Sequence, residues 1–342
     1  MSVALVLPLS GPIGLLGPSI LASARLAVAE INEKGGIAGR ELVPQLIDAS
    51  TVFEAGGMES LSLLIDSGRI DAVACFHSPE VRNALASVVK GRVPLAYTPA
   101  QCDEYRNPNV WNTGVRLTDR LGEAIKTVRD ELGLRSWAMV VNEAPSIRKI
   151  DAVVKGAVRE NEGQVVSEHL VPHGTKDFRP VLRKLAERRP DAVFVNLMGQ
   201  DAVLFNRQFG AAGLSDATFR ISTSVEENVI LASGRKNTRG LIQISPYISD
   251  LETHSADRFR QAYLAYHGAG APAVTCGGQS AYDGLHFLSV LLNSEVDQSL
   301  DRLVDYPSGR AGPYSPTKDA AEDSTLDIAR VEGLRFKEFL KA

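Results

Sequence analysis

Short polar side chains follow several apolar runs of this sequence, and they are its clearest candidates for chemistry. Ser78 comes directly after the run 70–76 and is followed by Pro79 and a helical pattern. A serine there can offer its hydroxyl, together with the free N–H groups of the helix start, to one carbonyl or carboxylate. Other runs end in the same way, at Ser10, Tyr97-Thr98-Pro99, Asn142-Glu143, Gln200 and Ser224. Each alone fits a cap or a turn, but together at one sheet edge they predict a site for a small polar ligand.

Three acids near the strand ends could pair with the ammonium group of an amino-acid ligand. They are Glu143, Asp201 and Glu226. Each fits equally well as a solvent-facing acid in the first turn of a helix, where the helix dipole favours negative charge. The charge of the ligand is therefore open at this stage.

The first loop has the glycine spacing G-x-x-G-x-x-G, from Gly11 to Gly17, between a predicted strand and a predicted helix. A dinucleotide site needs G-x-G-x-x-G and a P-loop ends in G-K-[ST], and neither motif is present. Asp48 ends the second predicted strand, where a ribose-binding acid would lie, so a nucleotide-dependent enzyme is an alternative. The preferred interpretation is a tight turn with Ser10 and Ser19 as capping hydroxyls.

No catalytic or metal-binding constellation is recognisable. His77 beside Ser78 is the nearest approach to a catalytic dyad, but adjacent residues rarely direct their side chains at one another. The sequence has no G-x-S-x-G elbow, and its 6 histidines show no H-E-x-x-H spacing. We expect Cys75, Cys102 and Cys276 to be buried thiols, with a Cys75–Cys102 disulfide as the alternative in an oxidising compartment. No metal and no cofactor are expected.

Short continuous apolar runs alternate with amphipathic segments, which predicts parallel strands covered by helices on both faces. The length of 342 residues and a division near residues 116–120 predict two doubly wound α/β lobes. The first lobe is expected to comprise residues 1–118 and 251–305, and the second residues 119–250 and 306–342. Because ligands of such sheets bind outside the carboxyl ends of the strands, the cleft between the lobes is the expected site.

The expected elements follow from these runs. Residues 306–324 are rich in Gly, Pro, Ser and Asp, which indicates a loop or crossover, and residues 326–340 indicate two strands around a turn. The other predicted strands are 3–9, 42–47, 70–76, 93–97, 137–141, 165–170, 192–197, 219–222 and 241–244. The predicted helices are 20–31, 58–67, 81–89, 119–132, 147–160, 178–188, 201–212, 256–267 and 281–292.

Composition and charge exclude several classes of protein. Against 37 Lys plus Arg stand 41 Asp plus Glu, and no basic run could follow a phosphate backbone, so nucleic acid is not an expected partner. Apolar stretches such as 285–292 fall far short of the ~20 residues that a bilayer span needs, so no membrane span is expected. Residues 3–7 already indicate a strand, with no secretory signal before them. The protein is therefore predicted to be cytoplasmic, or periplasmic if a signal peptide was removed.

Three segments carry a specific family resemblance: PLSGP at 8–12, AEINEKGGIAGR at 29–40, and the strand end Ile47-Asp48. In them the chain resembles the type I periplasmic binding proteins of the leucine/isoleucine/valine-binding class. Within that class it most resembles the branch that holds the amide-binding regulator of amidase operons and the receptors for urea and short-chain amides. Further similarity covers residues 75–78 with Arg82, 97–99, 199–202, 237–241, 246–247 and 280–284, and so nearly the full length.

The resemblance implies two lobes joined by a three-strand hinge, a ligand clamped in the cleft and no catalytic activity. Ser78, Tyr97 and Thr98 match family positions that bind the polar head of the ligand, and Phe76 matches an aromatic position lining the pocket. The full set of expected ligand-binding residues is Ser10, Phe76, Ser78, Tyr97, Thr98, Pro99, Asn142, Glu143, Gln200, Ser224, Glu226 and Tyr247. Where relatives of the amide branch carry aromatic residues, this chain has Ala144 and Ser146, which predicts a roomier wall in the second lobe.

Two functions share this fold and cleft. The leading hypothesis is the substrate-binding component of an ABC transporter, which closes on an amide, a urea-like compound or an amino acid and is then recognised by a permease. The alternative is a cytoplasmic amide sensor that controls a transcription antitermination regulator. Relatives commonly form dimers through the first lobe, so a homodimer is a further expectation from the resemblance.

Overall fold

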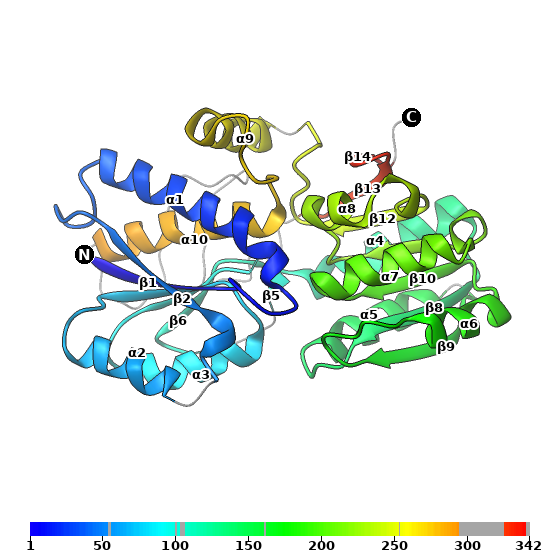
Figure 1. Ribbon diagram of the computed structural model, residues 1–342, viewed down its shortest axis with the longest axis horizontal. Coiled ribbons are helices and arrows are strands. Elements are labelled where there is room, and N and C mark those ends of the chain that lie inside the picture. Colours follow the sequence, from blue (N-terminus) through cyan, green and yellow to red (C-terminus); the bar gives the residue numbers. More distant parts are fainter. Residues whose placement is uncertain are drawn as a thin grey trace. The chain divides into compact units, whose positions relative to one another are not determined.

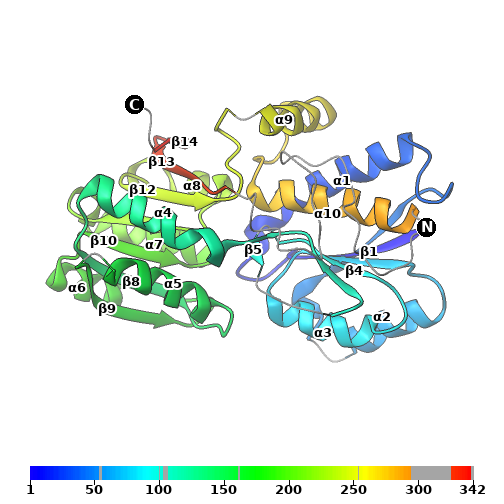
Figure 2. The same ribbon diagram turned by 180° about the vertical axis from the view of Figure 1, so that it is seen from behind.

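A computed structural model describes residues 1–53, 56–99, 101–102, 107–160, 162–252, 254–293 and 325–339, with no side chains for 101–102 and 254–257. The chain divides into two compact units, which Figures 1 and 2 show from opposite sides. Unit 1 is Met1–Arg116 with Glu252–Ser324, and unit 2 is Leu117–Leu251 with Thr325–Ala342. The chain therefore passes from one unit to the other three times. The predicted loop 306–324 lies outside the described residues.

Unit 1 is built on a parallel five-stranded sheet in the order β2-β1-β3-β4-β6. Helices α1 and α10 cover one face of this sheet, and α2 and α3 cover the other (Figure 1). Alternate residues of a strand face opposite sides, so Ala4 and Val6 pack into the cluster made with α2 and α3. The strands are β1 (Ser2–Leu7), β2 (Val43–Asp48), β3 (Ala72–Cys75), β4 (Leu95–Tyr97) and β6 (Val110–Asn112), and β5 (Gln101–Cys102) pairs separately with β7 (Val115–Arg116). The helices are α1 (Gly17–Glu33), α2 (Gly57–Asp66), α3 (Pro79–Val89), α9 (His254–His267) and α10 (Cys276–Asn293).

Helix α10 begins five residues before the predicted start at residue 281, because glycines at its first turn weaken the helical pattern. At Gly278 the glycine is required by the close approach of α1. A Cβ atom there would lie 2.6 Å from Ser23 Oγ and 2.8 Å from Ser19 Oγ. The glycine that permits this helix contact thus lies before the apolar run from which the helix was predicted.

The segment Gly14–Glu33, which contains α1, is long and apolar enough to cross a membrane by length and composition, the one such helix among the described residues. It is longer than the apolar stretch 285–292 on which the prediction of no membrane span depends. Residues such as Ile20, Leu26 and Ile31 are buried within unit 1. Packing in the core thus accounts for the apolar character of this helix.

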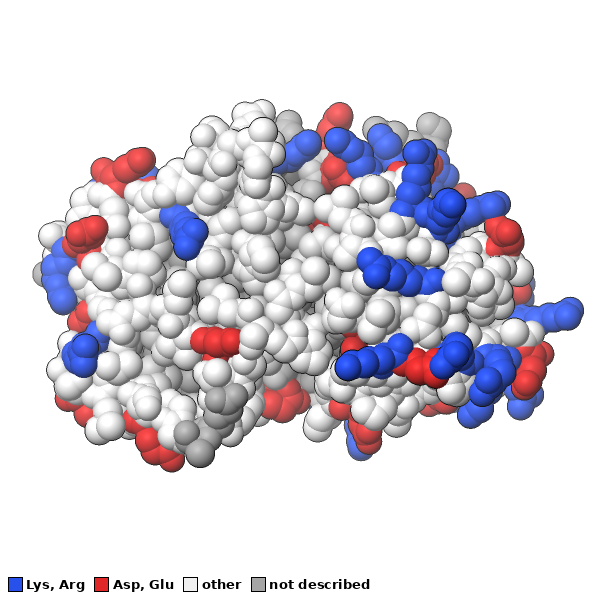
Figure 3. Space-filling model, in the orientation of Figure 1, with Lys and Arg blue, Asp and Glu red and all other residues white. Residues whose placement is uncertain are grey.

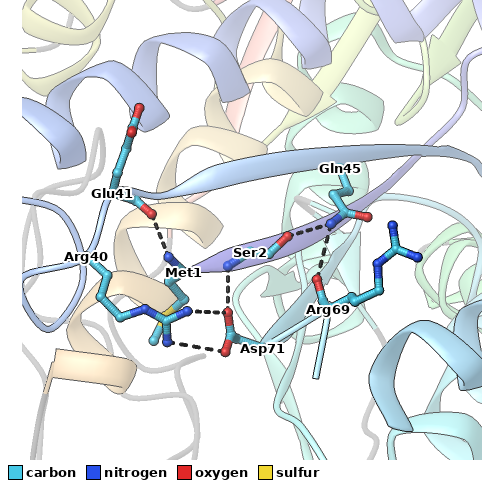
Figure 4. A network of polar contacts seen from close by, with 7 residues as sticks. All are labelled: Met1, Ser2, Arg40, Glu41, Gln45, Arg69 and Asp71. Atoms are coloured by element: carbon cyan, nitrogen blue, oxygen red, sulfur yellow. Dashed lines mark hydrogen bonds and ion pairs between the residues drawn. The ribbon is translucent and has the colours of Figure 1, made fainter. Parts of the chain in front are cut away.

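The amino-terminal edge of the unit 1 sheet is closed by a polar network (Figure 4). Ser2 N donates to Asp71 Oδ2 over 2.6 Å, and Arg40 pairs with Asp71 over 3.5 Å. Gln45 Nε2 donates to Ser2 Oγ over 2.7 Å and to the Arg69 carbonyl over 3.1 Å. These bonds hold β1, β2 and β3 together at the edge opposite their carboxyl ends.

Unit 2 contains a seven-stranded sheet in the order β14-β13-β12-β11-β10-β8-β9, in which β13 and β14 run antiparallel as an edge hairpin. Helices α4 and α5 cover one face, and α6 and α7 cover the other (Figures 1 and 2). The strands are β8 (Ser136–Asn142), β9 (Gln164–Val171), β10 (Ala192–Asn196), β11 (Phe219–Ser222), β12 (Leu241–Ser245), β13 (Asp327–Glu332) and β14 (Arg335–Glu338). The helices are α4 (Leu117–Leu132), α5 (Ile147–Arg159), α6 (Arg179–Arg188), α7 (Gln200–Ala211) and α8 (Glu227–Ser233). Short 3-10 turns lie at 214–216 and 235–237 in unit 2, and at 14–16 and 49–51 in unit 1.

The sequence did not predict β5, β6, β7 and α8. The three strands have two or three residues each, and the seven residues of α8 are too few to show a helical period. The side chains of Lys and Arg are also distributed unevenly. On the face shown in Figure 3, they gather over unit 2 and are sparse over unit 1.

Candidate functional site

The order of the strands in unit 1 determines where a ligand can reach the carboxyl edge of the sheet. The connection after β1 leads to α1 on one face, and the connection after β3 leads to α3 on the other. The two loops therefore diverge between neighbouring strands, and such a switch point is where open α/β sheets bind ligands. Ser10 lies in the first of these loops and Ser78 in the second.

Ser78 occupies the position before α3 with extended backbone angles, φ −66° and ψ 160°. Within the described residues its hydroxyl makes no capping hydrogen bond to the helix, and it lies 3.4 Å from His77 Nδ1. The loop itself is held in place, since the Tyr97 hydroxyl donates to the His77 carbonyl over 2.8 Å. The simple capping role considered from the sequence is therefore not the role of the Ser78 side chain.

Tyr97 and Thr98 are buried and take part in the internal structure of unit 1. The Tyr97 ring belongs to the core cluster, with the Arg82 guanidinium 4.9 Å from its centre. Thr98 Oγ1 donates to the Cys75 carbonyl over 3.2 Å, and the Thr98 carbonyl accepts a hydrogen bond from Ser280. Phe76 is buried beside them, and Pro99 is half-buried. These residues lie at or just after the carboxyl ends of β3 and β4, and Ser78 follows β3 in the loop before α3.

The first glycine loop has a structural explanation. A Cβ atom at Gly17 would lie 2.4 Å from the Pro8 carbonyl oxygen, so glycine allows α1 to start against the end of β1. Ser10 Oγ contacts Ser50 Oγ at 2.7 Å, and Asp48 Oδ1 accepts from Ser50 N at 3.1 Å. Partial burial opposes it, but the hydrogen bonds from Ser10 and Ser50 hold the pKa of Asp48 below its ordinary value. Asp48 is thus used to tie two loops together, which removes the feature that favoured a ribose site.

Unit 2 has its own switch point between β8 and β10. Asn142 ends β8 and is fully buried; its Nδ2 donates to Asp201 Oδ2 over 2.9 Å, and its Oδ1 accepts from Met198 N over 2.9 Å. Asp201 also accepts from Gly174 N at 3.0 Å. Asn142 and Asp201, which were candidates for ligand binding from the sequence, both use polar atoms in these internal hydrogen bonds.

Four further candidates lie around the same edge of unit 2. Glu143 and Gln200 are exposed. Ser224 Oγ donates to the Leu197 carbonyl over 2.9 Å, and half-buried Glu226 precedes α8 without a side-chain cap bond to that helix in the described structure. Each unit thus presents its own set of polar groups at the carboxyl edge of its own sheet.

Tyr247 is buried in the segment that follows β12. Its backbone is held by Ser245, whose hydroxyl donates to the Tyr247 carbonyl over 2.9 Å. Its neighbour Ile248 is also buried. Tyr247 therefore has a defined position at the edge of unit 2.

Glu227 is a buried acid that the sequence analysis did not single out. Its Oε1 accepts from Ser249 N at 3.0 Å and from Ser249 Oγ at 2.6 Å. Burial raises the pKa of Glu227 to about 8, against the opposing effect of the hydrogen bonds from Ser249. The sequence contains no signal that separates Glu227 from Glu226, because α8 is too short to show which face is buried.

A hollow on unit 1 of about 380 Å³ lies away from these residues. It is lined by Leu5, Leu21, Arg25, Val28, Ala29, Asn32, Pro44, Leu46 and Tyr266. None of these was a predicted ligand-binding residue, and they belong to α1, α9 and the middle of β1 and β2. The hollow is therefore separate from the carboxyl edge.

Metal-binding and redox chemistry find no support in the part of the chain that the structure describes. It contains no group of three His, Cys, Asp or Glu side chains that could hold a metal ion. Cys75 and Cys276 are buried and form no disulfide, and burial raises the pKa of the Cys75 thiol. The side chain of Cys102 lies outside the described structure. The alternative of a Cys75–Cys102 disulfide is therefore wrong for this structure, in which the Cys75 sulfur is unpaired.

Comparison with known proteins adds a family match. A family model described as periplasmic binding protein matches residues 1–298. The Leu/Ile/Val-binding protein homolog 6 of Brucella suis is 21% identical over 301 residues, which are 86% of this chain and 76% of that protein. Leu/Ile/Val-binding protein BraC3 of Rhizobium johnstonii is 24% identical over 255 residues, 70% of this chain and 69% of that protein.

Two solved structures share the fold. The substrate-binding protein LivJ of Streptococcus pneumoniae, in complex with isoleucine, has a TM-score of 0.83 and 18% identity, covering 98% of this chain and 97% of that one. A solute-binding protein of an ABC transporter from R. palustris, in complex with benzoate, has a TM-score of 0.78 and 18% identity, covering 99% and 95%. The predicted α/β fold with two parallel-sheet lobes is confirmed.

Proposed function

Because the chain belongs to the periplasmic binding protein family, in its type I, Leu/Ile/Val-binding class, we propose that it binds a small polar solute as the substrate-binding component of an ABC transporter. The polar groups at the carboxyl edges of the sheets are the proposed ligand contacts. A ligand that binds one conformation of the protein better than another would favour it, and a membrane permease would recognise the ligand-bound conformation. A periplasmic location follows from this proposal.

The observation that carries the proposal is that the Ser78 hydroxyl makes no capping hydrogen bond to α3 in the described structure. The hydroxyl lies at the switch point of unit 1 and at the start of α3, an eleven-residue helix whose first N–H groups have no helical partners. The buried guanidinium of Arg82 in the same helix adds positive charge beneath this position. A carbonyl or carboxylate oxygen is the ligand group that such donors take.

The proposed ligand class follows from the ligand oxygen that Ser78 would bind and from the acids of unit 2. An amino acid would place its carboxylate at Ser78 and its ammonium near Glu226, whereas an amide or a urea-like compound would present only its carbonyl oxygen. The relatives named above are Leu/Ile/Val-binding proteins, and the solved structures hold isoleucine and benzoate. We therefore place small carboxylates first and keep amides and urea as the second class.

A thermal-shift screen of the full chain tests both classes. The probes are L-leucine, L-isoleucine, L-valine, benzoate, 4-hydroxybenzoate, acetamide and urea, and the expected result is a rise in the unfolding temperature with at least one carboxylate. Calorimetry with that compound then compares Ser78→Ala with Ser87→Ala, an exposed serine at the other end of α3. Binding should weaken at least tenfold in Ser78→Ala and stay unchanged in Ser87→Ala. Equal affinity in both variants would place the ligand elsewhere.

A further inference from the structure

Two hydrogen bonds join α8 to the segment by which the chain leaves unit 2. Both end on one atom, Glu227 Oε1, which accepts from Ser249 N at 3.0 Å and from Ser249 Oγ at 2.6 Å. Both residues are buried. The first segment of unit 2 ends two residues later at Leu251, where the chain crosses into unit 1.

The segment between β12 and this crossing is anchored at three points. The Ser245 hydroxyl donates to the Tyr247 carbonyl over 2.9 Å, Glu227 holds Ser249, and Asp250 Oδ2 accepts from Phe336 N of β14 at 2.8 Å. Tyr247 lies between the first two anchors. The Glu227 side chain on α8 thus holds the backbone two residues after Tyr247, a residue expected to bind the ligand.

We propose that Glu227 is a positioning residue, which acts through Ser249 to fix the backbone of Tyr247 and the path of the chain into the crossing at Leu251. The use of this role in ligand binding rests on the proposed function, since Tyr247 is one of the residues expected from the sequence to bind the ligand. Glu227 itself is assigned no contact with the ligand. A change in the charge of Glu227 would alter the site from the side of unit 2, while Ser78 on unit 1 stays unchanged.

The contact between Glu227 and Ser249 should depend on pH, because Glu227 can ionise. An ionised carboxylate accepts hydrogen bonds more strongly than a protonated one, so the hold on Ser249 is tighter when Glu227 is ionised. Burial raises its pKa to about 8, the bonds from Ser249 lower it, and the charge of Glu226 raises it. The charged groups on the neighbouring elements are Asp201 and Arg207 of α7, Arg235 and Lys236 of the 3-10 turn after α8, Asp250 of the crossing segment, and Arg335, Lys337 and Glu338 of β14. Glu227 accepts its side-chain hydrogen bonds from Ser249. In the described structure it forms no ion pair with any of these charged groups.

Nuclear magnetic resonance of the full, ligand-free chain tests the proposal without any ligand. The probes are the δ1 methyl group of Ile248 and the labelled ring of Tyr247, assigned with Ile248→Val and Tyr247→Phe. Between pH 6 and pH 9.5 both signals should shift with one midpoint near pH 8. In Glu227→Gln, which keeps an oxygen acceptor but cannot ionise, the shift should vanish. In Glu226→Gln it should persist, with its midpoint at lower pH.

A second variant tests the proposal even if the Glu227→Gln protein does not fold. Ser249→Ala keeps the acid and the backbone donor but removes the hydroxyl, so the midpoint should move to higher pH. A merely structural contribution of Glu227 would not move a midpoint. The proposal is overturned if the two signals do not titrate in the parent protein, or if their titration survives in Glu227→Gln. Either result would leave the test of Ser78 and of the proposed function standing.

Discussion

The side-chain amide of Asn142 donates a hydrogen bond to the carboxylate of Asp201 over 2.9 Å at the carboxyl edge of the unit 2 sheet. Asn142 ends β8, and Asp201 lies in the first turn of α7, which follows β10. The two residues therefore join the strands on either side of the switch point, where the loops of a ligand site begin to diverge.

Asn142→Ala should destabilise the protein. The substitution leaves the buried Met198 N–H without its acceptor, at a cost of about 1–3 kcal/mol. It also removes one of the two hydrogen bonds to Asp201 Oδ2, which keeps the one from Gly174 N, and a hydrogen bond to a charged group contributes about 1.5–3 kcal/mol. We expect the free energy of unfolding, measured by urea denaturation, to fall by about 2–4 kcal/mol. Glu143→Gln, at the exposed neighbouring position, is the control and should change it by less than about 0.5 kcal/mol. Similar values for the two variants would contradict a structural role for Asn142.

Ser78→Ala should leave stability almost unchanged. Removing a serine that caps a helix typically costs about 1 kcal/mol, but the Ser78 hydroxyl makes no cap bond to α3 in the described structure. The expected loss in the free energy of unfolding is below about 0.5 kcal/mol, measured by urea denaturation without ligand. A loss near that of an ordinary cap would show that the hydroxyl serves the helix.

Gly284→Ala should destabilise unit 1 because a Cβ atom there would lie 2.2 Å from Thr98 Cγ2 and 2.8 Å from Thr98 Cβ. Thr98 is itself buried, so the clash cannot be relieved toward solvent. Overpacking of this kind costs about 1–3 kcal/mol. The matched control is Gly156→Ala in α5, where no heavy atom lies within 4 Å of the new Cβ. That change should stabilise the helix by about 0.5–1 kcal/mol, and thermal unfolding of both variants checks the opposite signs.

Stability should fall as the pH rises toward 8, in part through Glu227. Its pKa in the folded protein is raised from 4.5 to about 8, so the folded state holds a proton that the unfolded state has already lost. Below pH 4.5 both states are protonated and the group has no effect. Between 4.5 and 8 the free energy of unfolding declines with pH, and above 8 the full penalty of the buried charge remains.

The comparison of Glu227→Gln with the parent protein isolates this contribution. Each unit of pKa difference corresponds to about 1.4 kcal/mol, so the parent should lose a few kcal/mol more than the variant between pH 5 and pH 9. Urea denaturation at both pH values measures the loss. Burial also raises the pKa values of Asp151 and Asp327 to about 6, so some decline should persist in the variant below pH 6. Parallel curves above pH 6 would refute the assignment to Glu227.

The order of the elements was predictable because each strand and each long helix carries its own apolar period. Phe219–Ser222 was predicted to the residue, and other strands were placed within about two residues at each end. Helix α8 and the start of α10 were not, for two reasons. The first is too short to show a period, and the second begins with glycines that serve the packing against Ser19 and Ser23.

The sequence by itself determined the fold class, the two lobes and the edge at which short polar residues gather, since these depend on patterns within neighbouring residues. Only the tertiary structure decided which of those polar atoms are already used. Asn142 is bonded to Asp201, 59 positions away, and Thr98 to the carbonyl of Cys75, whereas the Ser78 hydroxyl makes no bond to the helix it precedes. The tertiary structure also decided that Glu227 is buried and that Glu226, its neighbour in the sequence, is only half-buried. The physical reason is that a side chain's partner is brought to it by the packing of distant elements, and that partner decides whether the group binds the protein or a ligand.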